Sequence, residues 1–162
     1  MQKITPCLWF DSNAEEAVKF YTSIFKNSKT LSVSHYTPSA EGVTGKKAGT
    51  VLTLLFQIEG QEFIALNGGP IFKFNEAISL SVSCETQEEV DALADKLSAV
   101  KEVEQCGWLK DKYGVCWQIV PAILPQMMLD KDPKKLSDGS NVFAAADGLA
   151  NKYGISVCAT TG

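Results

Sequence analysis

Hydrophobic and polar residues alternate along several stretches of the chain, a pattern typical of half-buried β-strands. In the first half, alternation or a β-rich composition predicts strands at residues 3–10, 30–36, 49–58 and 62–67. Between the first two strands, apolar residues recur every three or four positions from 14 to 25, which predicts an amphipathic helix. The first half is therefore predicted to fold as strand, helix, strand, strand, strand.

The ends of this first helix also carry local signals. Asn13 is a good N-cap, and Glu15 and Glu16 follow in the first turn, where the helix dipole favours negative charge. We therefore expect the helix to begin after Asn13 and to end near Lys26 and Asn27.

The same order of elements begins again in the second half. Residues 77–84 alternate as a strand, and Thr86 is predicted to cap a second helix. Further strands are expected at 103–108 and in a hairpin at 106–121, CGWLKDKYGVCWQIVP, with its turn at 112–114. With Asn13 set over Thr86, four more positions match at one offset: Glu15 with Glu88, Glu16 with Glu89, Phe20 with Leu93, and Ile24 with Leu97.

This repeat predicts an α+β fold in which two βαβββ modules, about residues 1–69 and 75–121, form a half-barrel. The concave face of such a half-barrel is a natural ligand cleft. We place this domain at residues 1–132 and expect a C-terminal helical extension and tail at 133–162.

The remaining segments have weaker signals. Residues 38–45 are rich in Ser, Gly and Thr and are expected to form a mobile loop, and residues 67–70 a plain turn. Helical spacing recurs at 122–129 and 133–146, while 147–162 is expected to be a surface or partly disordered tail.

Composition narrows the classes of function. The chain has 162 residues, 45% of them hydrophobic and 21% charged, which is typical of one soluble globular domain. With a net charge of −4 and no clustered basic residues, we expect no nucleic-acid partner. The longest apolar run, 51–56, is far below the ~20 residues that span a bilayer, and no secretory signal is evident, so we expect a cytoplasmic protein without a membrane segment.

The five cysteines form no C-x-x-C pair and are odd in number, which favours reduced thiols over a disulfide framework or a zinc site.

Three motifs carry a resemblance to a known family: TPCLWFDSNAEEAVKFY at 5–21, ALNGGPIFKFNEAISLSV at 65–82, and the hairpin motif at 106–121. With them the chain resembles the vicinal oxygen chelate superfamily, or glyoxalase/bleomycin-resistance fold. Within it the chain looks like the PhnB-like branch, often labelled 3-demethylubiquinone-9 3-methyltransferase. The likeness implies a homodimer, since paired modules in this superfamily commonly share a cleft across a two-fold axis. Beyond residue 146 the tail departs from the family pattern, which ends in a helix rich in Met, Ala and Ile.

Metal-dependent members of the superfamily carry His or Glu near the middle of the first and last strand of each module. The equivalent positions here fall within 5–7, 65–67 and 77–79 and at Gln118, and none is His, Asp or Glu. Neutral amides hold transition metals poorly, so we predict no cofactor and treat Gln118 only as a weak candidate ligand for a divalent metal. The chain also lacks the G-x-G turn of Rossmann-like methyltransferases, so the methyltransferase label comes from the family alone.

The candidate residues of the cleft are aromatic, amide, thiol and ionic side chains on the predicted strands. Aromatic rings would suit a flat or apolar ligand. A thiolate beside Lys110 would be activated, although a buried thiol is the common alternative, and Lys110 with Asp111 is expected to form a solvated ion pair. The full set is Cys7, Trp9, His35, Asn67, Cys106, Trp108, Lys110, Cys116, Trp117 and Gln118.

Three functions remain open at this point. The first is a protein that binds an apolar or aromatic small molecule in the cleft, either without catalysis or as an enzyme without a tightly held metal. The second is an enzyme of the superfamily, either a methyltransferase as the family label suggests or a metal-dependent lyase or dioxygenase. The third is a protein that sequesters a ligand, like the antibiotic-binding relatives.

Overall fold

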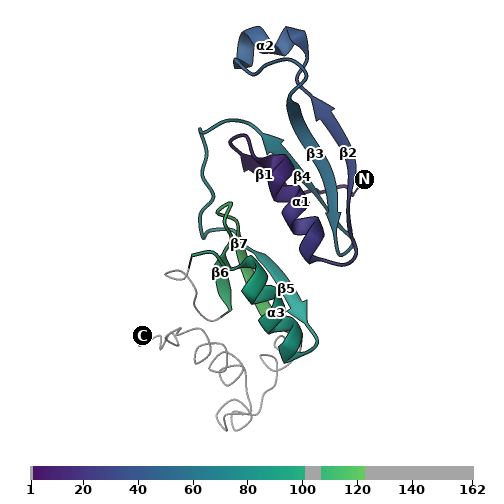
Figure 1. The fold of residues 1–162 in the computed structure, drawn as a ribbon, viewed down its shortest axis with the longest axis vertical. Coiled ribbons are helices and arrows are strands. Elements are labelled where there is room, and N and C mark those ends of the chain that lie inside the picture. Colours follow the sequence, from purple (N-terminus) through teal and green to yellow (C-terminus); the bar gives the residue numbers. More distant parts are fainter. Residues whose placement is uncertain (1, 101–106, 123–162) are drawn as a thin grey trace. The chain divides into compact units, whose positions relative to one another are not determined.

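The computed structural model describes residues 2–100 and 107–122, and the chain divides into two compact units, Met1–Phe74 and Asn75–Gly162. In the first unit the elements follow the order β1 (Cys7–Phe10), α1 (Ala14–Ile24), β2 (Ser28–His35), α2 (Pro38–Thr44), β3 (Val51–Ile58) and β4 (Gln61–Asn67) (Figure 1). In the second unit they are β5 (Leu80–Cys84), α3 (Gln87–Leu97), β6 (Trp108–Lys110) and β7 (Cys116–Pro121).

The sheet of the first unit has the strand order β1-β4-β3-β2, with β1 parallel to β4 and the other neighbours antiparallel. Helix α1 packs on one face of this sheet. The core between them consists of alternate strand residues and one stripe of the helix: Leu8, Phe10, Leu54, Phe56, Ile58, Phe63 and Ala65 with Ala14, Ala17, Val18 and Tyr21. The period of two along β1, β3 and β4 matches their burial, as predicted. The half-burial predicted for the strand at 30–36 is wrong, because β2 is the edge strand of the sheet and its residues from Lys29 to His35 are all exposed.

The predicted start of α1 is confirmed, but the expected capping bond is not made by Asn13. Asn13 occupies the N-cap position, but its side chain makes no capping hydrogen bond. Asn67, at the end of β4, accepts the Ala14 N–H on Oδ1 at 2.9 Å and donates through Nδ2 to Glu15 Oε2 at 2.7 Å and to the Val51 carbonyl at 3.1 Å. The helix start is thus capped from a strand 53 residues away, because Asn67 lies beside Phe10 in the sheet.

The segment predicted as a mobile loop forms the short helix α2. Pro38 stands in its first turn, where its fixed φ suits a helix and its missing N–H costs nothing. Gly45 ends the helix in the left-handed conformation at φ 68°, and its N–H donates to the Glu41 carbonyl at 2.9 Å. No residue of α2 is buried, so these two local signals, rather than packing, account for the helix.

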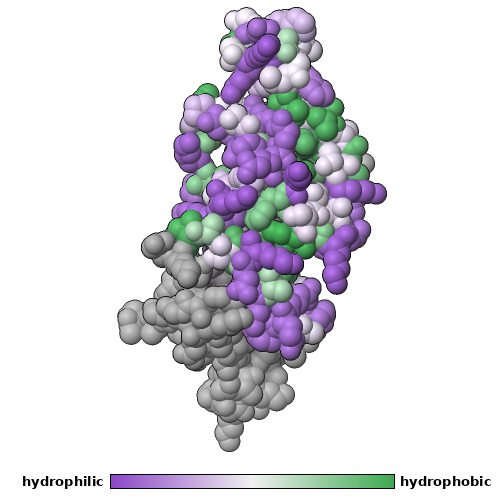
Figure 2. Space-filling model, viewed as in Figure 1, coloured by the Kyte–Doolittle hydropathy of each residue, from purple (hydrophilic) through white to green (hydrophobic). Residues whose placement is uncertain are grey.

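The second sheet has the order β5-β7-β6, with β5 parallel and β6 antiparallel to β7. Helix α3 packs on one face through four buried residues, Val90, Leu93, Ala94 and Leu97. The predicted cap is confirmed, because the Thr86 hydroxyl accepts the Glu89 N–H at 3.2 Å. Figure 2 shows hydrophilic side chains over the outer side of α3.

Both units place a helix directly after their first strand and pair that strand in parallel with their last. The predicted α+β fold class is thereby confirmed, with two small sheets and three helices in the described part of the chain. Most of the strand predicted at 103–108, and the elements predicted beyond residue 122, lie outside the described residues. Among the described residues, no helix has both the length and the apolar character needed to cross a bilayer.

Candidate functional site

The second sheet is covered by α3 on the side of Leu109, Trp117 and Ile119, which are all buried. Strand alternation turns Cys116 and Gln118 to the other face. The register sets Gln118 between Trp108 of β6 and Ser81 of β5, and it sets Lys110 beside Cys116. Among the described residues of the second unit no helix packs on this face, and its residues are named here the open face: Ser79, Ser81, Trp108, Lys110, Cys116 and Gln118.

Gln118 and Trp108 give the open face its polar and aromatic groups. Gln118 Nε2 donates to Ser79 Oγ at 2.6 Å, and within the described residues its amide oxygen accepts no hydrogen bond. Trp108 is half-buried, and its indole N–H likewise has no hydrogen-bond partner in the described part of the chain. A hydrogen-bond acceptor, a donor and an aromatic ring therefore lie next to one another on one sheet.

Lys110 lies at one end of the open face, beside Cys116. The expected ion pair with Asp111 is wrong, because Lys110 Nζ instead pairs with Glu76, which precedes β5. The pKa of Glu76 is lowered chiefly by the hydrogen bond from Lys110, and the pKa of Lys110 is raised by the same bond.

Asp111 is buried beneath the hairpin rather than exposed. Its Oδ1 accepts the backbone N–H groups of Tyr113 at 2.9 Å and Val115 at 3.0 Å, and its Oδ2 accepts the Trp117 indole N–H at 2.9 Å. Trp117 is 2% exposed and packs on the helix side. Asp111 and Trp117 thus stabilise the β6–β7 hairpin, and Trp117 lies in the core and not on the open face.

The thiols differ in their surroundings. Cys116 is buried, and desolvation raises its pKa more than the neighbouring Lys110 lowers it, so the expected activation by Lys110 is outweighed. Cys7 is exposed on β1, and partial burial of its thiol raises its pKa. Cys106 lies outside the described residues.

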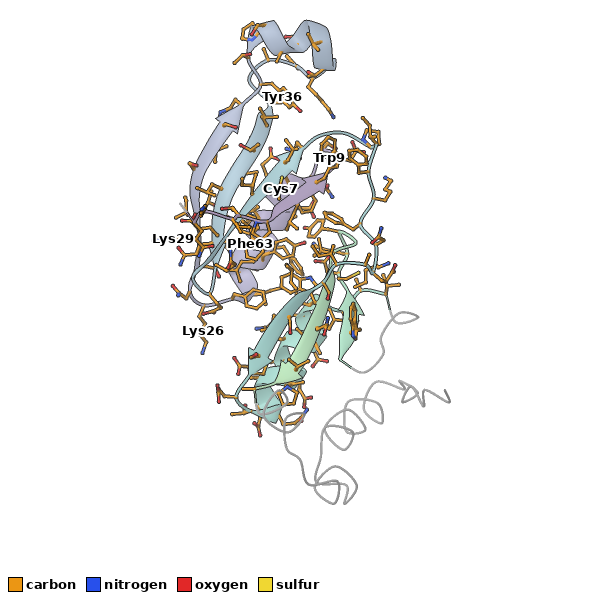
Figure 3. The ribbon with its side chains drawn as sticks, turned by 180° about the vertical axis from the view of Figure 1, so that it is seen from behind. Cys7, Trp9, Lys26, Lys29, Tyr36 and Phe63 are labelled. Atoms are coloured by element: carbon orange, nitrogen blue, oxygen red, sulfur yellow. The ribbon has the colours of Figure 1, made fainter. Side chains whose placement is uncertain are left out.

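Trp9 lies on the face of the first sheet that α1 does not cover, beside Leu66 (Figure 3). Its indole N–H donates to the Gly69 carbonyl at 2.8 Å, and its ring meets Phe72 edge-on at 4.9 Å. Gly68 lies against the flat of the indole with no room for a Cβ. The glycine pair after β4 therefore serves to seat Trp9.

Two further candidates, His35 and Asn67, belong to the first unit. His35 is exposed at the end of the edge strand β2, opposite Val51. Asn67 is buried, and its side-chain oxygen and nitrogen both bond within the fold, as described for the start of α1. Its backbone carbonyl also accepts the Tyr36 hydroxyl at 2.7 Å, so Asn67 holds the first unit together.

The residues at the metal positions of the superfamily do not form a donor set for a transition metal. In the described ranges, no group of three or more His, Cys, Asp or Glu side chains converges. Gln118 directs its amide nitrogen at Ser79, and the Asn67 side chain is engaged by α1. The described residues at these positions do not fit a bound divalent metal.

Sequence reasoning missed Ser79, Ser81 and Glu76. The serines were detectable, because residues 79, 81 and 83 alternate with apolar positions and must share one face of their strand. Glu76 has no such signal, since it lies in an irregular connector and reaches Lys110 34 positions away.

Comparisons with known proteins place the chain among related sequences. A family model described as 3-demethylubiquinone-9 3-methyltransferase matches residues 2–120. The PhnB protein from Bacillus cereus is 39% identical over 73% of this chain and 98% of its own, with a TM-score of 0.60. A protein from Staphylococcus aureus is 29% identical over 74% of this chain and 95% of its own, with a TM-score of 0.33. No curated protein matches the chain.

Proposed function

The chain belongs to the PhnB-like, 3-demethylubiquinone-9 3-methyltransferase family, and from this premise we propose that it binds a flat, partly apolar small molecule on the open face of the second sheet. The observation that carries the proposal is the juxtaposition of a half-buried indole with an amide whose oxygen has no partner in the described part of the chain. A polar group in such surroundings is one that a ligand can satisfy.

The two groups would act differently on a ligand. A ring stacked on Trp108 gains apolar burial and an offset stacking contact of about 0.5–1.5 kcal/mol beyond that burial. The Gln118 oxygen then accepts a hydroxyl or N–H at the ring edge, and its bond to Ser79 fixes the orientation of the amide. Stacking supplies affinity, and the amide supplies orientation.

The family description names methyl transfer, and for this chain that activity is an alternative proposal. Transfer from S-adenosylmethionine on a Rossmann-like sheet needs a glycine-rich turn between a strand and a helix. Here β1 leads into α1 through Asp11-Ser12-Asn13, and β5 leads into α3 through Glu85-Thr86. Because neither connection contains glycine, binding without a resident cofactor is the better-supported proposal.

We further propose that the chain acts as a homodimer in a reducing, cytoplasmic compartment. Cys7, Cys84 and Cys116 are free thiols, which supports the compartment. The dimer is what the family resemblance implies, and multi-angle light scattering tests it. A monomer at micromolar concentration would remove the version in which two chains share a cleft.

Tryptophan fluorescence tests the binding proposal with a panel of flat aromatic probes. Trp117 is buried and bonded to Asp111, so it should report little, whereas Trp108 should be quenched. We expect the quench to disappear in Trp108→Phe and to persist in Trp9→Phe. In calorimetry, Trp108→Ala and Gln118→Ala should each weaken binding by about tenfold. Affinities equal to wild type in both variants would refute the proposed site.

A further inference from the structure

The ion pair between Lys110 and Glu76 lies at one end of the open face. Lys110 follows Trp108 by two residues on β6, so both side chains leave the same face of the strand, about 7 Å apart along it. Glu76 comes from the connector before β5, where the Asn75 side chain accepts the Ala77 N–H at 3.0 Å and shapes the turn. The cation is thus part of the sheet, while the anion comes from a turn outside it.

The two partners differ in how firmly they are held. The Lys110 side chain is 20% exposed and that of Glu76 is 57% exposed. Ion pairs with so exposed a partner contribute little to stability, because water competes for the charges and the side chains lose freedom. An anion that gains additional contacts on the open face would therefore displace Glu76 at small cost.

We propose that Lys110 binds the carboxylate of a flat aromatic acid whose ring lies on Trp108, and that Glu76 occupies Lys110 as an internal competitor when no ligand is bound. This inference rests on the proposed function and names the ligand class of the same site. It also assigns Glu76 a role in setting affinity, since any ligand anion must first replace it.

The charge of the site matches a monoanion. Lys110 is the one basic residue in the sequences of β5, β6 and β7. One lysine balances one carboxylate, whereas a phosphate dianion would keep unbalanced charge beside the half-buried indole. The neutral groups Gln118 and Ser79 remain for a hydroxyl or N–H on the ring. A singly charged aromatic acid therefore fits this row of residues.

Calorimetry with two probes separates charge recognition from ring recognition. Benzoate carries the charge, and benzamide has the same shape without it. We expect Glu76→Gln to bind benzoate about two- to fivefold tighter than wild type, the factor that an exposed ion pair can supply. Lys110→Met should bind benzoate at least about tenfold more weakly. Glu88→Gln, which removes the same charge from α3 on the opposite side of the sheet, should match wild type.

Benzamide should bind all four proteins alike. If benzamide binds in a Trp108-dependent way while benzoate affinity is unchanged in Glu76→Gln or Lys110→Met, this inference is wrong and the proposed function stands. If neither probe binds wild type, and no probe of the fluorescence panel quenches Trp108, both fail.

A second measurement identifies displacement of Glu76 directly. In the free protein Lys110 holds the pKa of Glu76 below its ordinary value. Carboxyl NMR should show that pKa return toward its ordinary value when benzoate saturates the protein. A Glu76 pKa that stays low at saturation would show that Lys110 never releases it and would overturn the competitor role.

Discussion

Replacing Asp111 by Asn should destabilise the protein far more than the near-identical shape of the two side chains suggests. The carboxylate accepts three N–H groups, two on Oδ1 and one on Oδ2, at 2.9–3.0 Å. An amide offers one acceptor and one donor in the same positions. Whichever way the amide is turned, one of its own N–H groups would face another N–H group.

The magnitude follows from the bonds lost. With the amide nitrogen toward Trp117, one charge-assisted bond of about 1.5–3 kcal/mol disappears, and the other two become neutral bonds of roughly half the strength. Relief of the cost of burying a charge offsets part of this loss. We expect the free energy of unfolding to fall by about 2–4 kcal/mol.

A double-mutant cycle with Trp117→Phe isolates the cause. Phe lacks the indole N–H, so Asp111→Asn should cost about 1–2 kcal/mol less in that background. Urea unfolding followed by far-UV circular dichroism gives the four free energies, with Glu88→Gln as a control for loss of an exposed acid. The reasoning is refuted if Asp111→Asn costs under about 0.5 kcal/mol, or if the two substitutions are additive.

Three further predictions concern other parts of the fold. In thermal melts, Gly68→Ala should destabilise the protein by about 1–3 kcal/mol and shift the tryptophan emission, because a Cβ would lie well under 3.0 Å from the Trp9 indole. The control Gly42→Ala, in α2 with nothing within 4 Å of the added Cβ, should be neutral or stabilising. Glu59→Asn should raise stability by about 0.5 kcal/mol in urea titrations, since φ at this position is 45° and Asn tolerates the left-handed region; an unchanged midpoint would contradict this. Desolvation, aided by the charge of Glu89, raises the pKa of the Cys84 thiol from 9.0 to about 11. As the pH rises, the unfolded chain therefore loses this proton before the folded protein does, and the free energy of unfolding should fall between pH 9 and 11. The fall should be shallower in Cys84→Ala, and equal slopes in the two proteins would refute the prediction.

Much of the fold follows from periodicity and local caps. The spacing of apolar residues located α1 and α3, and Thr86 was recognisable as a cap because the cap hydrogen bond spans only three residues. The cap of α1 was not recognisable, because Asn13 carries the correct local signal and Asn67 supplies the bond from the neighbouring strand. The sequence shows which residue types can cap a helix, but the sheet register determines which side chain accepts the N–H groups at its start.

Lys110 and Asp111 show a different limit. Adjacent opposite charges suggest an ion pair, yet Lys110 is the last residue of β6, and the carboxylate of the following Asp111 is turned beneath the hairpin to accept N–H groups there. The D-x-Y-G-V pattern contained the better signal, since an Asp that accepts N–H groups two and four residues later closes a turn, as it does with Tyr113 and Val115. The local sequence thus contained a signal for the role of Asp111 that our prediction of an ion pair overlooked, whereas the partner of Lys110 required the fold.

The same alternation decides which tryptophan faces a ligand. We predicted from the sequence that Trp108 and Trp117 both belong to the cleft, but in the hairpin Trp108 pairs with Gln118, and Trp117 pairs with Leu109. Because cross-strand partners lie on the same face of a sheet, Trp108 lies on the open face with Gln118, and Trp117 lies in the core with Leu109. The Gly114 N–H bond to the Asp111 carbonyl at 3.0 Å and the Asp111 N–H bond to the Val115 carbonyl at 3.0 Å fix this register. A slip of one residue would exchange the two rings, and thus Asp111, through the turn that it closes, determines which aromatic ring the open face presents.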